Sequence, residues 1–85
     1  MAKQFHLQVF TQEKKVVDEA VTSVVVPGED GYFGVLADHA PLIASLGSGK
    51  LTIINGTAER VMQISGGFAE VVKNTLTILT DSVAA

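Results

Sequence analysis

Apolar and polar residues alternate with a spacing of two along most of this chain, and β-branched residues are frequent. This pattern is typical of β-strands that bury one face. It is clearest over residues 5–10, where Phe5, Leu7 and Val9 form the predicted buried face ahead of a polar turn at residues 11–14. We therefore expect an almost all-β chain.

A second strand is predicted from Val16 to Val26. Its more apolar face is expected to point to the core and consists of Val16, Asp18, Ala20, Thr22, Val24 and Val26. Pro27-Gly28 should end the strand, because proline cannot donate to a ladder and glycine adopts turn dihedrals. Residues 28–34 hold three glycines and two acids and are expected to form an irregular loop before a short apolar piece, Val35-Leu36.

The rest of the chain also divides at turn residues, the first of them at 37–41 and 47–49. Asn55-Gly56 predicts a hairpin with a type I′ turn, and a last hairpin is expected around Asn74. Ser65-Gly66-Gly67 predicts a bulge or a corner between two sheets. The extended segments predicted between these turns are 42–46, 50–54, 59–64, 68–73 and 75–80.

The tail differs from the preceding pattern. Asp81-Ser82 followed by small residues is typical of the beginning of an α-helix, so a helix is expected to start here. Elsewhere, short strands with turns at this spacing, and no helical pattern between them, predict a flattened antiparallel β-sandwich or barrel. Parallel α/β folds are excluded.

Length and composition narrow the function classes. The 85 residues fit one small domain, 1–85, and 47% hydrophobic residues provide a core. Six basic and nine acidic residues give a net charge of −3, which argues against a nucleic-acid partner. Cysteine is absent, which agrees with a reducing, cytoplasmic location, and no apolar run is long enough to insert into a membrane.

The chemistry-bearing residues do not form a recognised catalytic or metal motif. His6 and His39 lie in unlike settings without the spacing of paired metal ligands, so we expect neither a metal nor a cofactor. Asp38-His39 beside Ser45 or Ser48 leaves a small hydrolase as one alternative. Neighbouring residues in a turn usually point apart, which favours a solvated loop histidine instead.

Glycines at positions 28, 31 and 34 suggest a phosphate-binding loop, but no Lys-Ser/Thr pair or helix follows them. Glu29 and Asp30 would also repel a phosphate, which favours a turn or a protein contact. The apolar residues on either side are interpreted as core: Val21, Val25, Val35, Leu36 and Leu42.

Several segments together resemble the epsilon-subunit family of F-type ATP synthase. The most specific are His39-Ala40-Pro41-Leu42 and, further on, Ser65-Gly66-Gly67-x-x-Glu70-Val71. Further matching pieces, in the same order and at the same spacing, are Phe5-His6-Leu7-Gln8-Val9, Pro27-Gly28-Glu29-Asp30-Gly31, Gly34-Val35-Leu36 and Leu76-Thr77-Ile78-Leu79-Thr80-Asp81. The resemblance covers nearly the whole chain.

This resemblance implies a flattened sandwich of ten strands in two sheets, with no catalytic role. It implies a rotor subunit in one copy per complex, seated on the gamma subunit and on the loops of the c-ring during proton-driven ATP synthesis. The subunit would be peripheral, at the cytoplasmic face of the energy-transducing membrane.

By the same resemblance, we expect c-ring contacts from Glu29, Asp30, Gly31, Tyr32 and His39. The expected gamma contacts are Leu42, Ser65 and Phe68, whereas Glu70 is interpreted as structural. Tyr32 departs from the family, which often has an acid there, so its contact should shift from charge pairing toward packing.

Family members usually continue into a helical hairpin that can inhibit ATP hydrolysis, and that segment is missing from this sequence. We therefore expect coupling without that brake, while the natural C-terminus stays open. Two other classes remain as alternatives. One is a freestanding β-sandwich module that binds a small ligand, and the other is the hydrolase built on Asp38 and His39.

Overall fold

The computed structural model describes residues 3–84, which form ten β-strands and no helix. This part of the chain therefore has no helix long and apolar enough to cross a membrane. The strands are β1 (Phe5–Phe10), β2 (Lys15–Val21), β3 (Ser23–Gly28), β4 (Gly31–Leu36), β5 (Leu42–Ser45), β6 (Ser48–Asn55), β7 (Ala58–Ser65), β8 (Phe68–Val72), β9 (Thr75–Leu79) and β10 (Ser82–Ala84).

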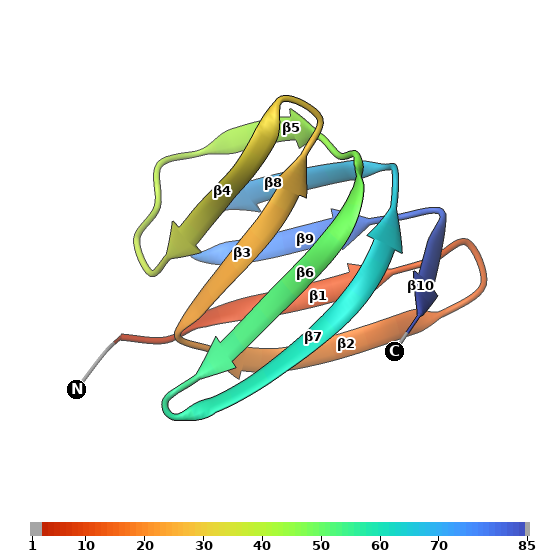
Figure 1. Ribbon diagram of the computed structural model, residues 1–85. Coiled ribbons are helices and arrows are strands. Elements are labelled where there is room, and N and C mark those ends of the chain that lie inside the picture. Colours follow the sequence, from red (N-terminus) through yellow and green to blue (C-terminus); the bar gives the residue numbers. More distant parts are fainter. Residues whose placement is uncertain (1–2, 85) are drawn as a thin grey trace.

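The strands form two five-stranded sheets that lie face to face (Figure 1). Sheet 1 has the order β2-β1-β9-β8-β5, and sheet 2 has the order β10-β7-β6-β3-β4. The predicted all-β sandwich is confirmed. One pairing departs from the antiparallel prediction, because β1 and β9 run parallel in the middle of sheet 1.

The core lies between the sheets and is made mainly of aliphatic side chains from both. Five large residues are fully buried: Leu7, Leu51, Ile64, Leu76 and Ile78. The predicted inward face of the first strand is confirmed, since Phe5, Leu7 and Val9 are all buried. Burial of such side chains contributes most of the stability of a domain this small.

The prediction of one strand from Val16 to Val26 is wrong. The chain bends at Thr22, where the hydroxyl donates to the carbonyl of Ile54 and accepts from the amide of Gly56. Before the bend the odd-numbered Val17 and Val21 face the core, and after it the even-numbered face is buried. The phase of burial therefore changes as the chain passes from sheet 1 to sheet 2.

The predicted irregular loop over residues 28–34 is also wrong. Pro27-Gly28 does end β3, as predicted, but β4 begins at Gly31 and pairs with β3 across a two-residue turn. The predicted core residues of this region divide, because Val35 is buried whereas Leu36 is 63% exposed on the outer face of β4. Val25 and Leu42 are half-buried, and Val21 lies in the core as predicted.

Both predicted hairpins are confirmed. In the first, Asn55 pairs with Ala58, so the two turn residues are Gly56 and Thr57 rather than Asn55-Gly56. Only Gly56 has a positive φ, which does not fit the predicted type I′ turn but is what a type II′ turn requires. The second hairpin has positive φ at both Lys73 and Asn74 (50° and 61°), as a type I′ turn requires.

The paired glycines form the predicted corner between the two sheets. β7 in sheet 2 is followed by β8 in sheet 1, and the chain turns at Gly66 and Gly67, which have φ values of 66° and 106°. A Cβ at Gly67 would overlap the carbonyl oxygen of Leu79. Glycine is therefore required here both for backbone conformation and for space.

The helix predicted to start at Asp81-Ser82 is not present in the described residues. Ser82–Ala84 instead form β10, which pairs with the edge of β7. Ala85, the last residue of the predicted tail, lies outside the described residues. The capping pattern was misleading because backbone groups of β7 are free to pair with the tail.

Candidate interaction surfaces

The turn between β3 and β4 presents two carboxylates to solvent. Gly28 pairs with Gly31, which leaves Glu29 and Asp30 as the turn residues, both exposed. A Cβ at Gly28 would lie 2.7 Å from the carbonyl oxygen of Gly31, so the tight closure needs glycine. Within residues 3–84 neither acid has an ion-pair partner. We call Glu29-Asp30 the acidic turn.

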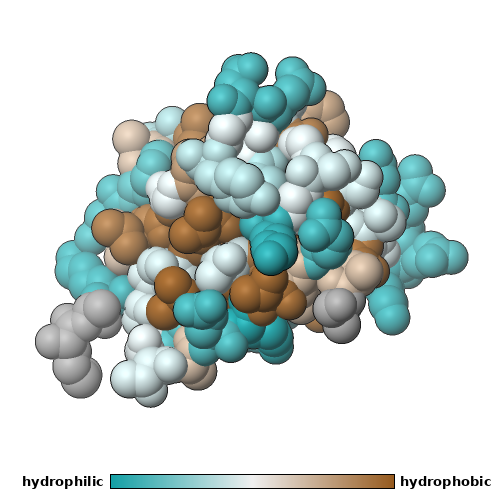
Figure 2. Space-filling model, viewed as in Figure 1, coloured by the Kyte–Doolittle hydropathy of each residue, from teal (hydrophilic) through white to brown (hydrophobic). Residues whose placement is uncertain are grey.

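The acidic turn is tied to the neighbouring sheet. The amide of Glu29 donates to the carbonyl of Ser45 at 2.8 Å, and the amide of Gly47 donates to the carbonyl of Pro27 at 3.0 Å. Figure 1 shows the turn beside β5, and Figure 2 shows hydrophilic side chains projecting at this end of the molecule. A hollow of about 350 Å³ lies here, lined by Gly28, Glu29, Asp30, Gly31, Phe33, Ile43, Ala44 and Ser45.

Tyr32 follows the acidic turn on the outer face of sheet 2. Its ring is 59% exposed, and its hydroxyl oxygen accepts a hydrogen bond from the amide of Lys50 at 3.0 Å. Gly31, the residue before it, has a φ of 138° and open space around it. Glu29, Asp30, Gly31 and Tyr32 therefore form one continuous stretch at one end of β4.

His39 lies beyond the other end of β4. Strand β4 spans Gly31–Leu36, which separates the two ends by about 17 Å at the usual rise per residue. His39 donates from Nδ1 to the carbonyl of Ala40 at 2.7 Å. The structure therefore does not bring His39 together with the acidic turn.

Asp38 and His39 do not form an acid-base pair with a serine. The carboxylate of Asp38 pairs with Lys3 at 2.8 Å, and its amide donates to the side chain of Asn74. Within residues 3–84, no side-chain hydrogen bond joins Asp38 or His39 to Ser45 or Ser48. The arrangement gives no support to the hydrolase alternative.

Phe68 belongs to an apolar row across the outer face of sheet 1. Phe10 pairs with Leu79, and Leu79 pairs with Phe68, so three neighbouring strands place these side chains side by side. Phe68 is 57% and Leu79 51% exposed. A hollow of about 310 Å³ at the row is lined by Phe10, Thr11, Gln12, Gly67, Phe68, Leu79, Thr80 and Asp81. We call Phe10, Leu79 and Phe68 the apolar row.

The other two predicted gamma-facing residues lie elsewhere. Leu42 is half-buried on β5 and packs against the core. Ser65 ends β7 in sheet 2, where its hydroxyl lies 3.2 Å from that of Ser48. Leu42, Ser65 and Phe68 therefore do not share one flat surface, although the corner after Ser65 leads directly to Phe68.

Sequence reasoning missed Phe10 and Leu79 as surface residues. Each is an apolar residue on the face of its strand that otherwise carries polar residues: Phe10 follows His6 and Gln8, and Leu79 follows Thr75 and Thr77. An apolar residue at a solvent-facing position is the sequence feature that could have identified them.

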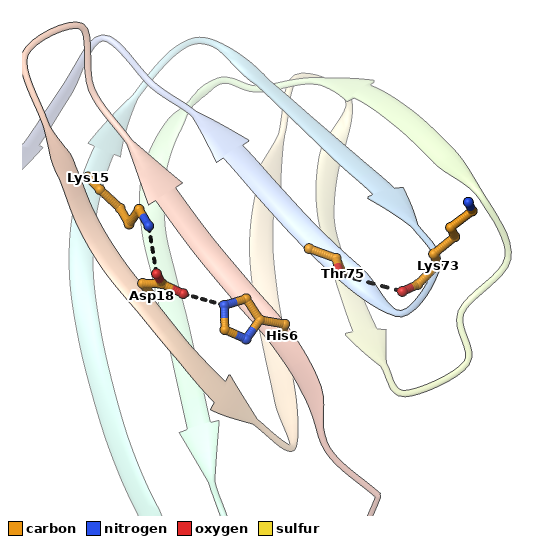
Figure 3. A network of polar contacts seen from close by, with 5 residues as sticks. All are labelled: His6, Lys15, Asp18, Lys73 and Thr75. Atoms are coloured by element: carbon orange, nitrogen blue, oxygen red, sulfur yellow. Dashed lines mark hydrogen bonds and ion pairs between the residues drawn. The ribbon is translucent and has the colours of Figure 1, made fainter.

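A polar network lies beside Phe10 of the apolar row, on the outer face of sheet 1. Figure 3 shows its residues His6, Lys15 and Asp18. The carboxylate of Asp18 accepts from Lys15 at 2.6 Å and also pairs with His6 on the adjacent strand. These bonds, first to Lys15 and then to His6, hold the pKa of the Asp18 carboxyl below its ordinary value of 3.8. Lys15 Nζ also lies 5.9 Å from the centre of the Phe10 ring.

The arrangement of side chains in residues 3–84 bears on two further kinds of site, one for a metal ion and one for a phosphate. Among the described residues, no three His, Asp or Glu side chains gather closely enough to hold an ion. The three glycines at 28, 31 and 34 lie in a β-hairpin and not before a helix. The geometry thus offers exposed surfaces for protein contact: the acidic turn and the apolar row.

Comparison with known proteins gives one consistent family. Residues 4–85 match the family described as ATP synthase, Delta/Epsilon chain, beta-sandwich domain. The ATP synthase epsilon chain of Leptospira interrogans is 42% identical over 80 residues, and that of Protochlamydia amoebophila is 50% identical over 80 residues. These alignments cover 94% and 93% of this chain but only 63% and 54% of the relatives.

Solved structures show the same fold. A chain of the Euglena gracilis mitochondrial ATP synthase, in a structure of OSCP, F1 and the c-ring, matches with a TM-score of 0.90 and 28% identity. The match covers 95% of this chain and 52% of the Euglena chain. A chain of the Tetrahymena thermophila mitochondrial ATP synthase central stalk and c-ring matches with a TM-score of 0.81 over 96% of this chain and 66% of its own length. Its 13% identity supports similarity of fold alone.

Proposed function

Because this chain belongs to the ATP synthase delta/epsilon chain beta-sandwich domain family, we propose that it is a non-catalytic subunit of the central stalk. In this role it couples the gamma subunit to the c-ring during proton-driven ATP synthesis, and one copy rotates with both. It is peripheral, at the cytoplasmic face of the energy-transducing membrane. The observation that carries the proposal is the match of nearly the whole chain to a chain of an F1 and c-ring assembly.

The architecture suits a part that transmits force. Two sheets share a close-packed aliphatic core, and interiors of this kind deform little under load. At the acidic turn, Glu29 also bonds to Ser45 of β5 in sheet 1, and Gly47, in the connection between β5 and β6, bonds to Pro27 of β3 in sheet 2. A force applied at this turn would therefore reach both sheets.

For the c-ring contact we propose the stretch Glu29, Asp30, Gly31 and Tyr32. Both acids are exposed and have no ion-pair partner within residues 3–84, so they are available to pair with basic or polar groups of a ring loop. His39 remains a proposed c-ring contact as well. Because β4 separates His39 from the acidic turn, a c-ring contact that includes both must extend along β4.

For the gamma contact we propose the face around Phe68. The apolar row is an exposed hydrophobic patch on a chain of net charge −3, and such patches mark protein contacts. Leu42 and Ser65 remain proposed gamma contacts, although they lie outside the apolar row. We assign coupling, and not inhibition of hydrolysis, to the β-sandwich.

The test of the gamma contact is binding of the chain to a purified gamma and c-ring subcomplex. Phe68→Asp should weaken binding by about tenfold or more, since it places a charge in a desolvated apolar contact. Val61→Asp is the control, because Val61 is an exposed apolar residue on the outer face of sheet 2, and β6 and β3 lie between its strand and β4. Equal binding by the Phe68 variant and the unmodified chain would contradict the gamma contact.

The c-ring contact is tested separately with a double variant, Glu29→Lys and Asp30→Lys. Charge reversal should slow association and change its salt dependence, because exposed charges at an interface act mainly on the rate of encounter. Glu13→Lys, an exposed acid in the turn between β1 and β2, is the control. If the unmodified chain does not bind the subcomplex but binds a small ligand saturably, the stalk function is wrong and a ligand-binding module replaces it.

A further inference from the structure

Strands β3 and β6 separate at Pro27. Their pairing runs only from Ser23 to Val25. Continuing the register of Val25 and Thr52 by two residues would place Pro27 opposite Lys50. Proline has no amide hydrogen, and the carbonyl of Pro27 accepts from Gly47 instead of from β6. The amide of Lys50 therefore has no backbone partner on β3.

Tyr32 supplies the missing partner. It sits on β4 opposite Pro27, and its hydroxyl oxygen reaches across β3 to accept from the amide of Lys50 at 3.0 Å. Pro27 is fully buried, although its neighbours Val26 and Gly28 place it on the outer face of sheet 2. The phenol thus connects an edge strand to a strand two positions away in the same sheet.

Gly49 makes room for this connection. A Cβ at this position would lie 2.5 Å from the hydroxyl oxygen of Tyr32 and 2.8 Å from the Cβ of Pro27. The contact between the ring and β6 is therefore possible only because residue 49 has no side chain. Three residues distant in sequence, Pro27, Tyr32 and Gly49, fit together at one point.

We propose that Tyr32 is a positioning residue that holds the acidic turn in place for the rotor. This inference rests on the proposed function, which assigns the acidic turn to the c-ring. Glu29 ties the turn to sheet 1 through Ser45, and Tyr32, only two residues after Asp30, ties it to β6 in sheet 2. β4 is an edge strand with β3 as its neighbour in the sheet. Without the phenol, the described bonds at the tip of the hairpin lead to β5 and to the connection after it at Leu46 and Gly47, and none leads to a strand of sheet 2 beyond β3.

The variant Tyr32→Phe tests this role, because it keeps the ring and removes only the hydroxyl. The amide hydrogen of Lys50 should exchange with solvent about fivefold faster or more, which corresponds to the loss of one hydrogen bond. The variant should also dissociate several-fold faster from a purified gamma and c-ring subcomplex, since a looser turn raises the entropy lost on binding. Gly49→Ala, which displaces the phenol from the other side, should have the same two effects.

Thr22→Val is the matched control. It removes a hydroxyl that bonds to Ile54 and Gly56 at the opposite end of β6, far from the acidic turn along the strand. It should leave both Lys50 exchange and dissociation from the rotor unchanged. A side chain without a hydroxyl at the position of the phenol oxygen cannot accept from the amide of Lys50. Tyr32→Leu should therefore show at least as large an effect as Tyr32→Phe.

Two results would overturn the proposal. One is unchanged exchange of Lys50 in Tyr32→Phe, and the other is equal loss of rotor binding in Tyr32→Phe and Thr22→Val, which would reveal a general effect on stability. If the unmodified chain fails to bind the rotor, the proposed function is wrong and the rotor role of Tyr32 falls with it. Lys50 exchange would then still decide whether the phenol holds the hairpin.

Discussion

The hydroxyl of Thr80 donates to the carbonyl oxygen of Gly66 at 2.8 Å, and the hydroxyl oxygen also lies 3.0 Å from the carbonyl oxygen of Ser65. Thr80 is the one buried polar side chain among the described residues, with 5% of its surface exposed. Its amide also donates to the carbonyl of Phe10. Thr80 thereby joins the corner between the sheets to the end of β1, beside the apolar row.

Replacing Thr80 by valine should destabilise the fold by about 1–3 kcal/mol. The shape of the side chain is retained, but the carbonyl of Gly66 loses the hydroxyl donor and the carbonyl of Ser65 keeps the amide of Asp81 without it. Urea denaturation of both chains measures the difference. Thr80→Ser keeps the donor and should recover most of the stability. An equal loss in the serine and valine variants would show that the methyl group, and not the hydroxyl, matters.

Gly67→Ala should be more damaging, with a loss above about 2 kcal/mol or failure to fold. Its φ of 106° disfavours any side chain, and the new Cβ would overlap the carbonyl of Leu79. Gly34→Ala is the control, since a Cβ there meets nothing within 4 Å. That variant should be neutral or slightly stabilising, because alanine restricts the unfolded chain. Thermal unfolding of the two variants would distinguish these outcomes.

The stability of the fold should depend on the charge of Asp18 in acid. The pKa of this carboxyl lies below its ordinary value of 3.8, so its contribution is fully present above that value. The contribution is lost as the pH falls through the lower pKa of the folded state. Thermal melts between about pH 5 and pH 2 should therefore show a weaker pH dependence for Asp18→Asn than for the unmodified chain.

A control and a contradicting result sharpen the Asp18 experiment. Asp30→Asn removes a carboxylate that has no ion-pair partner within residues 3–84 and should leave the pH dependence as it is. The assignment fails if Asp18→Asn melts in parallel with the unmodified chain at every pH.

Glu19 and Arg60 should contribute little to stability despite their short contact. They come from different sheets and meet at 2.7 Å beside a hollow of about 220 Å³. Their side chains are 39% and 50% exposed, so solvent screens the pair. A double-mutant cycle with Glu19→Gln and Arg60→Gln should give a coupling below about 1 kcal/mol. A coupling that is larger and insensitive to salt would contradict this expectation.

Local turn chemistry made part of the fold predictable from sequence. The hairpin at Asn74 and the corner at Gly66 and Gly67 follow from residues that tolerate positive φ. The alternation over Phe5–Phe10 likewise reports burial directly. These features depend on neighbours along the chain, which is why one sequence suffices to find them.

The failures arise where distant backbone decides the structure. Apolar residues occupy both phases between Val16 and Val26, so the pattern could not show that burial changes phase at Thr22. That bend is fixed by bonds to Ile54 and Gly56, more than thirty residues away. The tail was mistaken for a helix for a related reason, because β10 depends on an edge of β7 that the local sequence does not reveal.

The candidate surfaces were predictable to different degrees. The acidic turn is visible in the sequence, since Glu29 and Asp30 are adjacent and lie between glycines. The apolar row is not, because it joins Phe10 to Leu79 through a parallel register between the two ends of the chain. The phenol of Tyr32 is equally hidden, as its partner on β6 is eighteen residues away.

The parallel pairing of β1 with β9 also has a consequence for biosynthesis. Strand β1 leaves the ribosome well before β9, its inner neighbour in sheet 1, because the chain between them must be translated first. Until Leu79 has been translated, one side of β1 keeps its backbone groups unpaired, and nascent strands in this condition are prone to aggregate. Sheet 1 can therefore close only after β9 has been translated. A chaperone that binds the chain before then would protect the unpaired side of β1 from aggregation.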